Sequence, residues 1–272
     1  MYLKPSRGQL KYWAGLGHGK IRRREGRFLA EGDKVVREAL RSGREIDAFL
    51  FRRDRDASRF PDMAEKTVYE LTGAEWKKIS QDKESEGIAA LMPVPRFRSA
   101  ADISPERETR LLLLHRVANP ANLGAILRSA HWFGIKTVLL SEGSVDLTHP
   151  KVIRASMGSV FHLDLIEQVD FMEILPEIRK HYRLFSTVTR GDLPPRPWGD
   201  TPSAVLLGNE SHGLPEALLS MTDEPWCIPR TGDADSLSLP QAAAVILYEW
   251  TKGQEGPSYM SFRIPPEAGE ES

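Results

Sequence analysis

The chain of 272 residues is 40% hydrophobic and 28% charged, a composition typical of a globular protein with enough apolar surface for a core. A single cysteine, Cys227, excludes an internal disulfide and a cysteine-rich zinc site, and it fits a reducing compartment. No apolar run approaches membrane-spanning length and the amino terminus lacks the apolar core of a signal peptide, so we expect a cytoplasmic protein without a membrane segment.

The net charge of −1 hides an asymmetry along the chain. Residues 1–60 carry 16 Lys and Arg against 8 Asp and Glu, whereas the remaining 212 residues carry 21 against 30. Basic clusters attract polyphosphates through counterion release, so the densest cluster, residues 20–27, is a candidate nucleic-acid contact. A solvated positive face or a flexible basic arm is the alternative. The candidate nucleic-acid-binding residues are Arg22, Arg23, Arg24 and Arg27.

We expect two folded pieces, because a proline-spaced and polar stretch divides the chain. The expected boundaries are a basic arm over 1–20, a small α/β domain over 21–93, a linker over 94–108, a larger domain over 109–252 and a mobile tail over 253–272. In the front piece, the apolar pattern predicts helices over 34–42 and 74–80 and strands over 46–51, 67–71 and 87–92.

Strands and helices alternate more regularly in the back piece. The expected strands cover 110–116, 137–141, 159–166, 183–188 and 204–208, and the expected helices cover 122–133, 150–157, 171–181, 215–222 and 239–250. Alternating elements with almost continuously apolar strands predict a parallel sheet that is covered by helices on both faces.

The most informative stretch is residues 119–134, which follows one apolar run and precedes another. Asn119 and Pro120 form a turn that ends the first strand, since proline lacks an N–H and fixes φ. The helix after it delivers Asn122 and Arg128 to the carboxyl end of a parallel strand, where open α/β sheets bind ligands. For Arg128 the structural alternative is a salt bridge with Glu210.

Two later loops have the same position after apolar segments. Glycines at both ends of residues 208–215 permit a close backbone approach to a ligand, with a simple turn as the alternative. This loop lacks the features of a phosphate-binding loop and of a dinucleotide fingerprint. In residues 227–240 a polar loop precedes an apolar helix, and the structural alternative is Ser238 as the helix N-cap with Pro240 in the first turn.

Three motifs then occur in a fixed order: Asn-Pro-x-Asn-Leu-Gly-Ala-Ile-x-Arg, Leu-Gly-Asn-Glu-x-x-Gly-Leu, and Ile-Pro…Ser-Leu…Ala-Ala-x-x-Leu-Tyr-Glu. Together they resemble the SpoU family of RNA ribose 2′-O-methyltransferases over residues 110–252. In the front piece, residues 27–32 and 86–90 resemble recurring stretches of that family's amino-terminal, RNA substrate-binding domain.

The resemblance implies an α/β fold in which the carboxyl-terminal parallel-sheet domain forms a deep trefoil knot, with a smaller amino-terminal α/β domain. It implies a homodimer through the carboxyl-terminal domain, S-adenosyl-L-methionine as cofactor and no metal. The knot would involve residues 208–213 and 228–242. By motif match, the cofactor-binding residues are Leu207, Gly208, Ile228, Ser236 and Leu237.

The same match gives a catalytic set of Arg128, Asn122, Glu210 and Ser238. A guanidinium stays protonated in proteins, so we expect Arg128 to bind the 2′-oxygen and a neighbouring phosphate rather than act as a base. The family usually has Asn where this chain has Ser238, and the shorter reach of serine can alter substrate positioning. Trp132 is expected in the core or at the dimer interface.

The leading hypothesis is therefore an S-adenosylmethionine-dependent RNA 2′-O-methyltransferase whose substrate is ribosomal RNA. A transfer RNA substrate is one alternative, and a non-catalytic RNA-binding or ribosome-assembly protein with the same fold is another. An α/β enzyme with a nucleotide cofactor is disfavoured by the missing phosphate-loop signatures. The histidines His115, His131, His149 and His212 are too scattered to propose a metal site.

Overall fold

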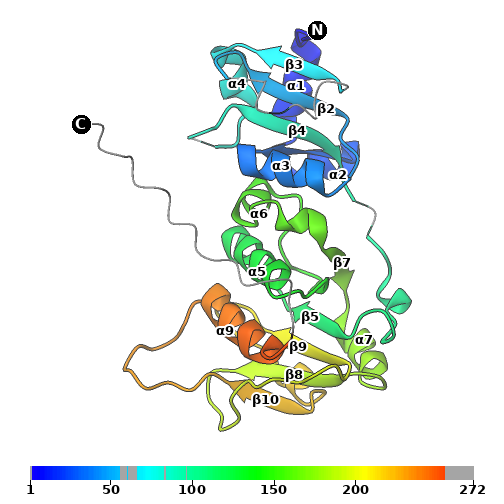
Figure 1. The fold of residues 1–272 in the computed structure, drawn as a ribbon, viewed down its shortest axis with the longest axis vertical. Coiled ribbons are helices and arrows are strands. Elements are labelled where there is room, and N and C mark those ends of the chain that lie inside the picture. The colour runs from blue at the N-terminus through cyan, green and yellow to red at the C-terminus, as the bar shows by residue number, and fades with distance from the viewer. Residues whose placement is uncertain (1, 56–59, 61–65, 83, 96, 255–272) are drawn as a thin grey trace, which may run out of the picture.

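A computed structural model describes residues 2–55, 60, 66–82, 84–95 and 97–254. Two α/β domains lie one above the other along the long axis of the molecule, and the segment after β4 (Ile88–Pro93) joins them (Figure 1). Within the described residues, no helix is long and apolar enough to cross a membrane. Residues 255–272, most of the expected mobile tail, lie outside the described part of the chain.

The front domain contains a four-stranded sheet in the order β1-β4-β2-β3. Strand β4 pairs antiparallel with β1 (Arg27–Glu31) and β2 (Ala48–Arg52), and β2 pairs parallel with β3 (Val68–Leu71). Because side chains alternate along a strand, each strand supplies both faces. Helices α1 (Arg7–Gly15) and α4 (Gly73–Ile79) cover one face, and α3 (Asp33–Arg41) covers the other.

The expectation of a separate basic arm over residues 1–20 is wrong, because residues 2–20 pack as part of the front domain. Ser6 caps α1 through a bond from the Gln9 N–H to its side chain, and Trp13 of this helix is 2% exposed. Before the helix, the Leu3 N–H donates to the Val68 carbonyl at 2.9 Å. This segment is therefore attached to the edge strand β3 through Leu3 and to the apolar core through Trp13.

The back domain contains a six-stranded sheet in the order β10-β8-β9-β5-β6-β7. All five strand pairs are parallel, which confirms the predicted parallel sheet. The strands are β5 (Arg110–Leu114), β6 (Thr137–Ser141), β7 (Asp164–Val169), β8 (Arg183–Val188), β9 (Ser203–Leu207) and β10 (Glu224–Cys227). The strand expected over 159–166 begins later, because residues Ser159–His162 form the 3-10 helix η4.

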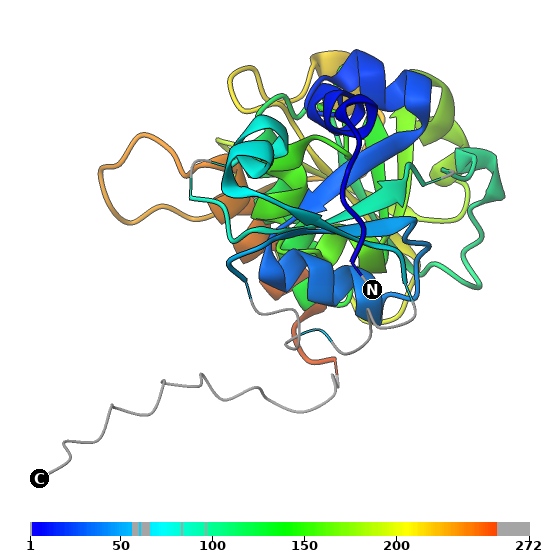
Figure 2. The same ribbon diagram turned by 90° about the horizontal axis from the view of Figure 1, so that it is seen from above.

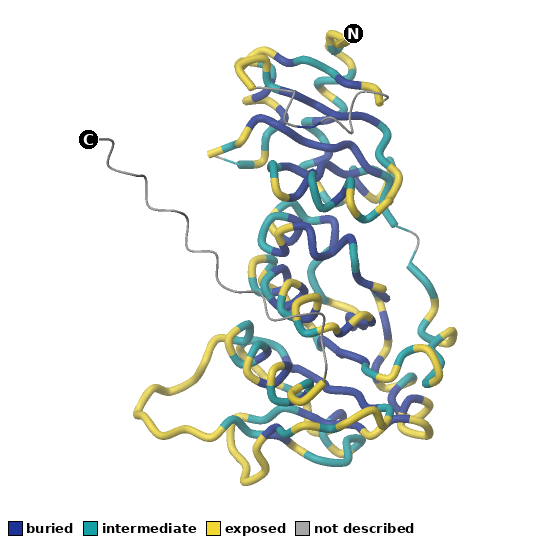
Figure 3. The backbone as a smooth tube through the Cα atoms, in the orientation of Figure 1, coloured by how far each residue is buried: buried dark blue, intermediate teal, exposed yellow. Residues whose placement is uncertain are grey.

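Helices cover both faces of this sheet, as the sequence predicts. On one face Leu112 and Leu114 of β5 pack with α5, α6 and α9, and on the other Leu111 and Leu113 pack with α7 and α8. The strands are the most deeply buried parts of the chain (Figure 3). The helices are α5 (Pro120–Trp132), α6 (Pro150–Ala155), α7 (Phe171–Ile178), α8 (Glu216–Leu219) and α9 (Leu239–Thr251).

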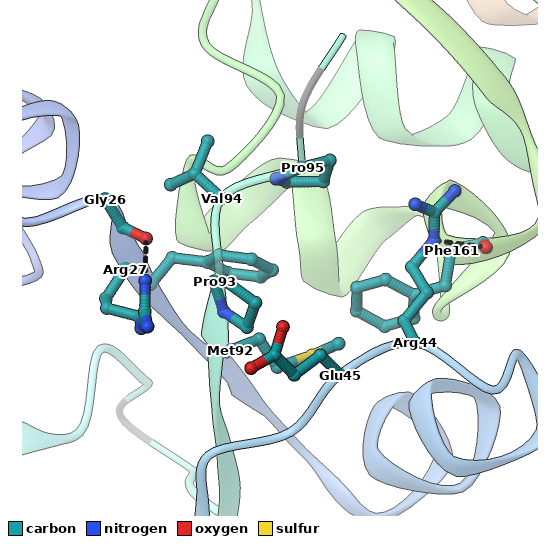
Figure 4. A pocket seen from close by; sticks show the side chains of 10 residues that line it. Gly26, Arg27, Arg44, Glu45, Met92, Pro93, Val94, Pro95 and Phe161 are labelled. Atoms are coloured by element: carbon teal, nitrogen blue, oxygen red, sulfur yellow. Dashed lines mark hydrogen bonds between the residues drawn. The ribbon is translucent and has the colours of Figure 1, made fainter.

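The two domains share an apolar core. One cluster of buried side chains runs from the α3 face of the front sheet to the α5 face of the back sheet, and Phe28 of β1 stacks on Phe161 of η4 with ring centroids 6.4 Å apart. A cavity of about 660 Å³ lies beside this contact. Figure 4 shows Arg27 and Arg44 on opposite sides of it.

A buried arginine also ties the domains together. Arg22 of α2 (Gly19–Glu25) is 2% exposed and forms an ion pair with Asp146 of the back domain at 2.6 Å. Its guanidinium also donates to Thr148 Oγ1 and to the carbonyls of Leu16 and Gly17, at 3.2, 2.9 and 3.0 Å. The domains are therefore joined by charge and by apolar packing.

The expected linker over 94–108 connects the domains and has local structure of its own. It contains the 3-10 helix η3 (Ala100–Asp102), and Arg98 forms an ion pair with Glu108 at 2.7 Å. Val94 begins it with a hydrogen bond from its N–H to the Gly26 carbonyl at 2.9 Å.

Candidate active site

Three loops meet at one edge of the back sheet. Strands β5 and β9 are neighbours, and β10 lies two places from β9 in a sheet whose strands all run in the same direction. The carboxyl ends of parallel strands share an edge, so the loops after them, residues 115–119, 208–213 and 228–238, lie on the same side of the sheet. The third loop projects away from the body of the protein (Figures 1 and 2).

The first loop ends in a capped helix. The side chain of Asn119 accepts a hydrogen bond from the Ala121 N–H at 2.9 Å, and Pro120 occupies the first turn of α5, where its missing N–H costs nothing. Gly124 allows α5 to lie against α6, since an added Cβ would be 2.7 Å from the Val152 carbonyl oxygen. Capping and close packing fix the direction in which Asn122 emerges from the first turn.

Glu210 joins the first loop to the second. Its carboxylate accepts hydrogen bonds from Asn122 Nδ2 at 3.2 Å and from the N–H groups of Asn119 and Ala118 at 3.1 and 3.3 Å. Burial would raise the pKa of this carboxyl, but these bonds and one from its own N–H hold the pKa below its ordinary value. Glu210 is therefore ionised at neutral pH and is a poor proton acceptor.

Asn209 organises the second loop, a role that the sequence did not reveal. Its Oδ1 accepts from the N–H groups of Ser211 and His212 at 2.9 and 3.1 Å, and its Nδ2 donates to the carbonyl of Arg116 at 2.7 Å. The only sequence signal was its place between the glycine and glutamate of the second motif.

Gly208 is enclosed by the backbone of its own loop. An added Cβ would lie 2.7 Å from both the Gly213 oxygen and the Leu214 nitrogen, closer than real Cβ atoms approach other atoms. Asn209 and Gly213 exchange two backbone hydrogen bonds of 3.0 Å, which close the loop above it. The loop needs glycine here for its close backbone approach.

Arg128 is the exposed cation of α5. Its side chain makes no hydrogen bond or ion pair with any described residue. In particular, Arg128 does not form the salt bridge with Glu210 that was the structural alternative to a catalytic role. One turn further along the helix, Trp132 is 66% exposed, so the expectation of a core position is wrong. The structure thus joins Asn122 to Glu210 and leaves the Arg128 guanidinium accessible.

The third loop suits a nucleoside ligand. Within residues 230–237, all of which the structure describes, no backbone N–H donates a hydrogen bond, so these groups are available. Leu237 is 49% exposed, Ser236 is exposed, and Ile228 is half-buried against the main core. Unengaged backbone N–H groups and the apolar Leu237 and Ile228 are compatible with an adenine ring, and the assignment of these residues to S-adenosylmethionine stays a prediction.

Ser238 directly precedes α9 at the N-cap position, which was the structural alternative to a role in the site. Its N–H and hydroxyl both donate to Gln241 Oε1, at 3.1 and 2.9 Å, and Pro240 lies in the first turn. No hydrogen bond joins Ser238 to Asn122, Arg128 or Glu210 in the described structure. Its catalytic role stays a prediction.

The four candidate RNA-binding arginines differ sharply in availability. Arg22 is buried in the interdomain ion pair, so it is a structural residue and not an RNA contact. Arg23 is exposed, and the Arg24 side chain is 73% exposed beside Glu25. Arg27 is partly exposed and pairs with Asp47 at 2.5 Å.

Many enzyme classes share a parallel α/β sheet with a polar edge, and comparison with known proteins places this chain among the S-adenosylmethionine-dependent RNA methyltransferases. More particularly, the chain belongs to the SpoU rRNA methylase family, whose model matches residues 109–248, just over half of its length. Residues 7–90 match the MRM3-like substrate binding domain. The predicted family is thereby confirmed. Among the described residues no group of three or more His, Cys, Asp and Glu could hold a metal.

Curated relatives are similar over most of the chain. RlmP of Bacillus subtilis, a 23S rRNA (guanosine(2553)-2′-O)-methyltransferase, is 28% identical over 244 residues, which cover 88% of this chain and 94% of the relative. The mitochondrial rRNA methyltransferase 3 of Xenopus laevis is 34% identical, with coverage of 85% and 70%.

Solved structures agree with the fold and the cofactor. An RNA 2′-O ribose methyltransferase is 31% identical with a TM-score of 0.79, covering 92% of this chain and 97% of its own. The methyltransferase AviRb of Streptomyces viridochromogenes, solved with S-adenosylmethionine, is 25% identical with a TM-score of 0.78 and coverage of 90% and 98%.

Proposed function

We propose that this protein transfers a methyl group from S-adenosylmethionine to the ribose 2′-hydroxyl of a nucleotide in ribosomal RNA. The observation that carries the proposal is the bond between Asn122 and Glu210. It joins the loops of two adjacent strands and leaves the exposed Arg128 on the same helix. The exposed Arg128 supplies a cation that is available to a ribose oxygen or a phosphate of the RNA.

The chain's residues bind and orient rather than exchange protons. S-adenosylmethionine supplies an electrophilic methyl group on a positively charged sulfur. The Arg128 guanidinium binds the 2′-oxygen and stabilises the negative charge that develops on it. Since Arg128 and the ionised Glu210 are both poor proton acceptors, the hydroxyl proton leaves to water or to an RNA phosphate. Glu210 keeps Asn122 and the two loops in place.

Ribosomal RNA is favoured over transfer RNA by the relatives and by the front domain. RlmP is named for a 23S rRNA guanosine, and a second relative, from Streptomyces viridochromogenes, for a 23S rRNA uridine. The front domain matches the substrate-binding domain of MRM3-like proteins, and α2 presents Arg23 and Arg24 to solvent. We propose the cytoplasm as the compartment where the protein meets this substrate.

We also propose a homodimer through the back domain. Trp132 at the end of α5 and Val245 and Tyr248 of α9 are 66%, 38% and 49% exposed, and these two helices pack together. Large apolar side chains gathered on two adjacent helices mark an interaction surface. Light scattering should report a dimer for the wild type and a monomer for Tyr248→Glu with Trp132→Glu. Met172→Glu, at an exposed methionine on the other face of the sheet, is the matched control. A monomeric wild type contradicts the proposal.

Transfer of labelled methyl from S-adenosylmethionine to unmodified large-subunit ribosomal RNA transcripts tests the function. We expect incorporation by the wild type, a loss of kcat of about 10²–10³ in Arg128→Ala, and partial activity in Arg128→Lys, because lysine keeps the charge without the planar fork. Lys180→Ala is the control, since this exposed lysine precedes β8 at the opposite edge of the sheet.

The substrates and variants separate the alternatives. Incorporation into transfer RNA transcripts alone would favour the transfer RNA substrate. Tight RNA binding without any incorporation would favour a non-catalytic RNA-binding protein. Equal activity of Arg128→Ala and the wild type would remove Arg128 from the chemistry.

A further inference from the structure

Arg116 has an unusual backbone for an arginine. It follows β5 by two residues and has a φ of 49°, in the left-handed region that side chains with a Cβ rarely adopt. Such conformations persist only where the surrounding structure holds them, and they concentrate at functional sites. This conformation of Arg116 therefore depends on contacts from the neighbouring loops.

Three contacts hold Arg116 in this conformation. Its N–H donates to Ser141 Oγ at 2.9 Å, and its carbonyl accepts from Asn209 Nδ2 at 2.7 Å. Its side-chain carbons lie against Gly143, whose added Cβ would be 3.6 Å from Arg116 Cγ. The loops after β6 and β9 thus fix Arg116 from both sides.

The charge at the end of the Arg116 side chain has no partner among the described residues. Arg116 is exposed, and its guanidinium makes no hydrogen bond or ion pair with a described residue. An exposed guanidinium without a protein partner is available to donate hydrogen bonds to a phosphate group.

Arg116 lies between the candidate active site and the front domain. On one side, Asn209 bonds both to Arg116 and to Glu210 of the catalytic cluster. On the other side, the loop after β6 leads from Gly143 through Val145, which donates its N–H to the Val117 carbonyl at 2.9 Å, to Asp146. Asp146 holds Arg22 of α2, the helix that presents the exposed Arg23 and Arg24.

We propose that Arg116 binds a backbone phosphate of the RNA strand that runs from α2 to the methyl-transfer site. This inference rests on the proposed function, which supplies RNA as the substrate. It adds a residue that positions the RNA to the candidate catalytic residues Asn122, Arg128 and Glu210. Arg116 fixes a flanking nucleotide, while Arg128 meets the reacting ribose. Because Ser141 and Asn209 hold the backbone of Arg116, only its side chain has to be ordered when the phosphate binds.

The test measures RNA binding as a function of salt. The probe is a fluorescently labelled 20-nucleotide oligouridylate, whose binding reports backbone contacts without base readout, followed by anisotropy. The variants are Arg116→Asn, which tolerates the left-handed backbone, and Arg116→Lys, which keeps the charge. The control is Lys180→Asn, which removes one positive charge from the opposite edge of the sheet.

We expect Arg116→Asn to bind the probe several-fold more weakly and to reduce the slope of log K against log salt by about 0.7 to 1, the value of one lost phosphate contact. Arg116→Lys should keep most of the slope, and Lys180→Asn should match the wild type. Affinity for S-adenosylmethionine, measured by calorimetry, should be unchanged in all three variants.

An Arg116→Asn slope equal to that of Lys180→Asn overturns the proposal, as does a wild type whose probe binding is independent of salt. Loss of S-adenosylmethionine affinity in Arg116→Asn also overturns it, because the residue would then act through the cofactor loops. A wild type that transfers no methyl but shows an Arg116-dependent slope contradicts the proposed function and leaves the phosphate contact in place.

Discussion

Replacing Arg22 by Gln should destabilise the protein far more than the same change at the next residue, Arg23. Arg22 is 2% exposed and gives its guanidinium to Asp146, to Thr148 and to two carbonyls at the end of the first helical segment. Glutamine cannot reach all of these groups, so the Asp146 carboxylate would lose its partner. Arg23 is exposed, and its loss leaves no buried group unpaired.

The magnitude follows from the burial of the pair. Removing one partner of a buried ion pair costs about 3 to 5 kcal/mol, and the 23% exposure of the Asp146 side chain lowers this to roughly 2 to 4 kcal/mol. For a chain of this size that corresponds to a fall in melting temperature of roughly 5 to 15 °C. Arg23→Gln should stay within about 0.5 kcal/mol of the wild type.

Differential scanning calorimetry at pH 7 checks the prediction. Burial would raise the pKa of Asp146, but bonds from Thr148 and Arg22 hold it below its ordinary value, so the pair stabilises the protein above the ordinary pKa and is lost as pH falls through the lower, folded one. The double variant with Asp146→Asn should recover part of the loss, because the unpaired charge is gone. If Arg22→Gln is as stable as Arg23→Gln, the structural role of Arg22 is refuted.

Three further changes test other parts of the structure. Gly208→Ala should destabilise the protein by about 1 to 3 kcal/mol, because the added Cβ would clash with the backbone of Gly213. The same variant should lose S-adenosylmethionine binding in calorimetry, and full binding would contradict the proposed approach of the cofactor to the Gly208 backbone. Burial raises the pKa of Glu167 to about 7, so the stability of the wild type should fall by about 2 to 3 kcal/mol between pH 4.5 and 7. In Glu167→Gln the melting temperature should depend less on pH over this range, and an unchanged pH dependence would refute the prediction. Ser238→Asn should keep stability within about 0.5 kcal/mol, since both residues cap helices well, while raising the methyl-transfer rate; an unchanged rate would show that the shorter serine is no handicap.

The sequence predicted the back domain well because its strands are almost continuously apolar. The run of four leucines in β5 and the repeated strand–helix alternation suffice for a parallel sheet covered on both faces. Strand β10 was missed because Pro225 interrupts it, and proline is tolerated in a sheet chiefly on an edge strand, the place that β10 occupies. Helix α1 was missed because Trp13 is its only buried residue, although Ser6 and Gln9 form a capping box that the sequence displays.

The geometry of the candidate site could be predicted only in part, and the roles of its residues stay predictions. The sequence placed Asn122 and Glu210 in one cluster, and the structure bonds them. It did not show that Arg128 would remain unpaired, because the distance between a helix face and a distant loop depends on how the helices pack. Nor could charge alone reveal which arginine of residues 20–27 turns inward, since neighbouring residues on a short helix point in different directions.

The apolar core that crosses from the front sheet to the back sheet has a consequence for catalysis. Two domains on a free linker would sample many mutual orientations, and RNA binding to one would have to stop that motion before the other could react, at a cost in entropy. Here the cost has been met during folding, because Phe28 and Phe161 stack in the resting protein. If both domains bind the RNA as proposed, their fixed separation sets how far along the RNA the modified nucleotide lies from the contact with the front domain.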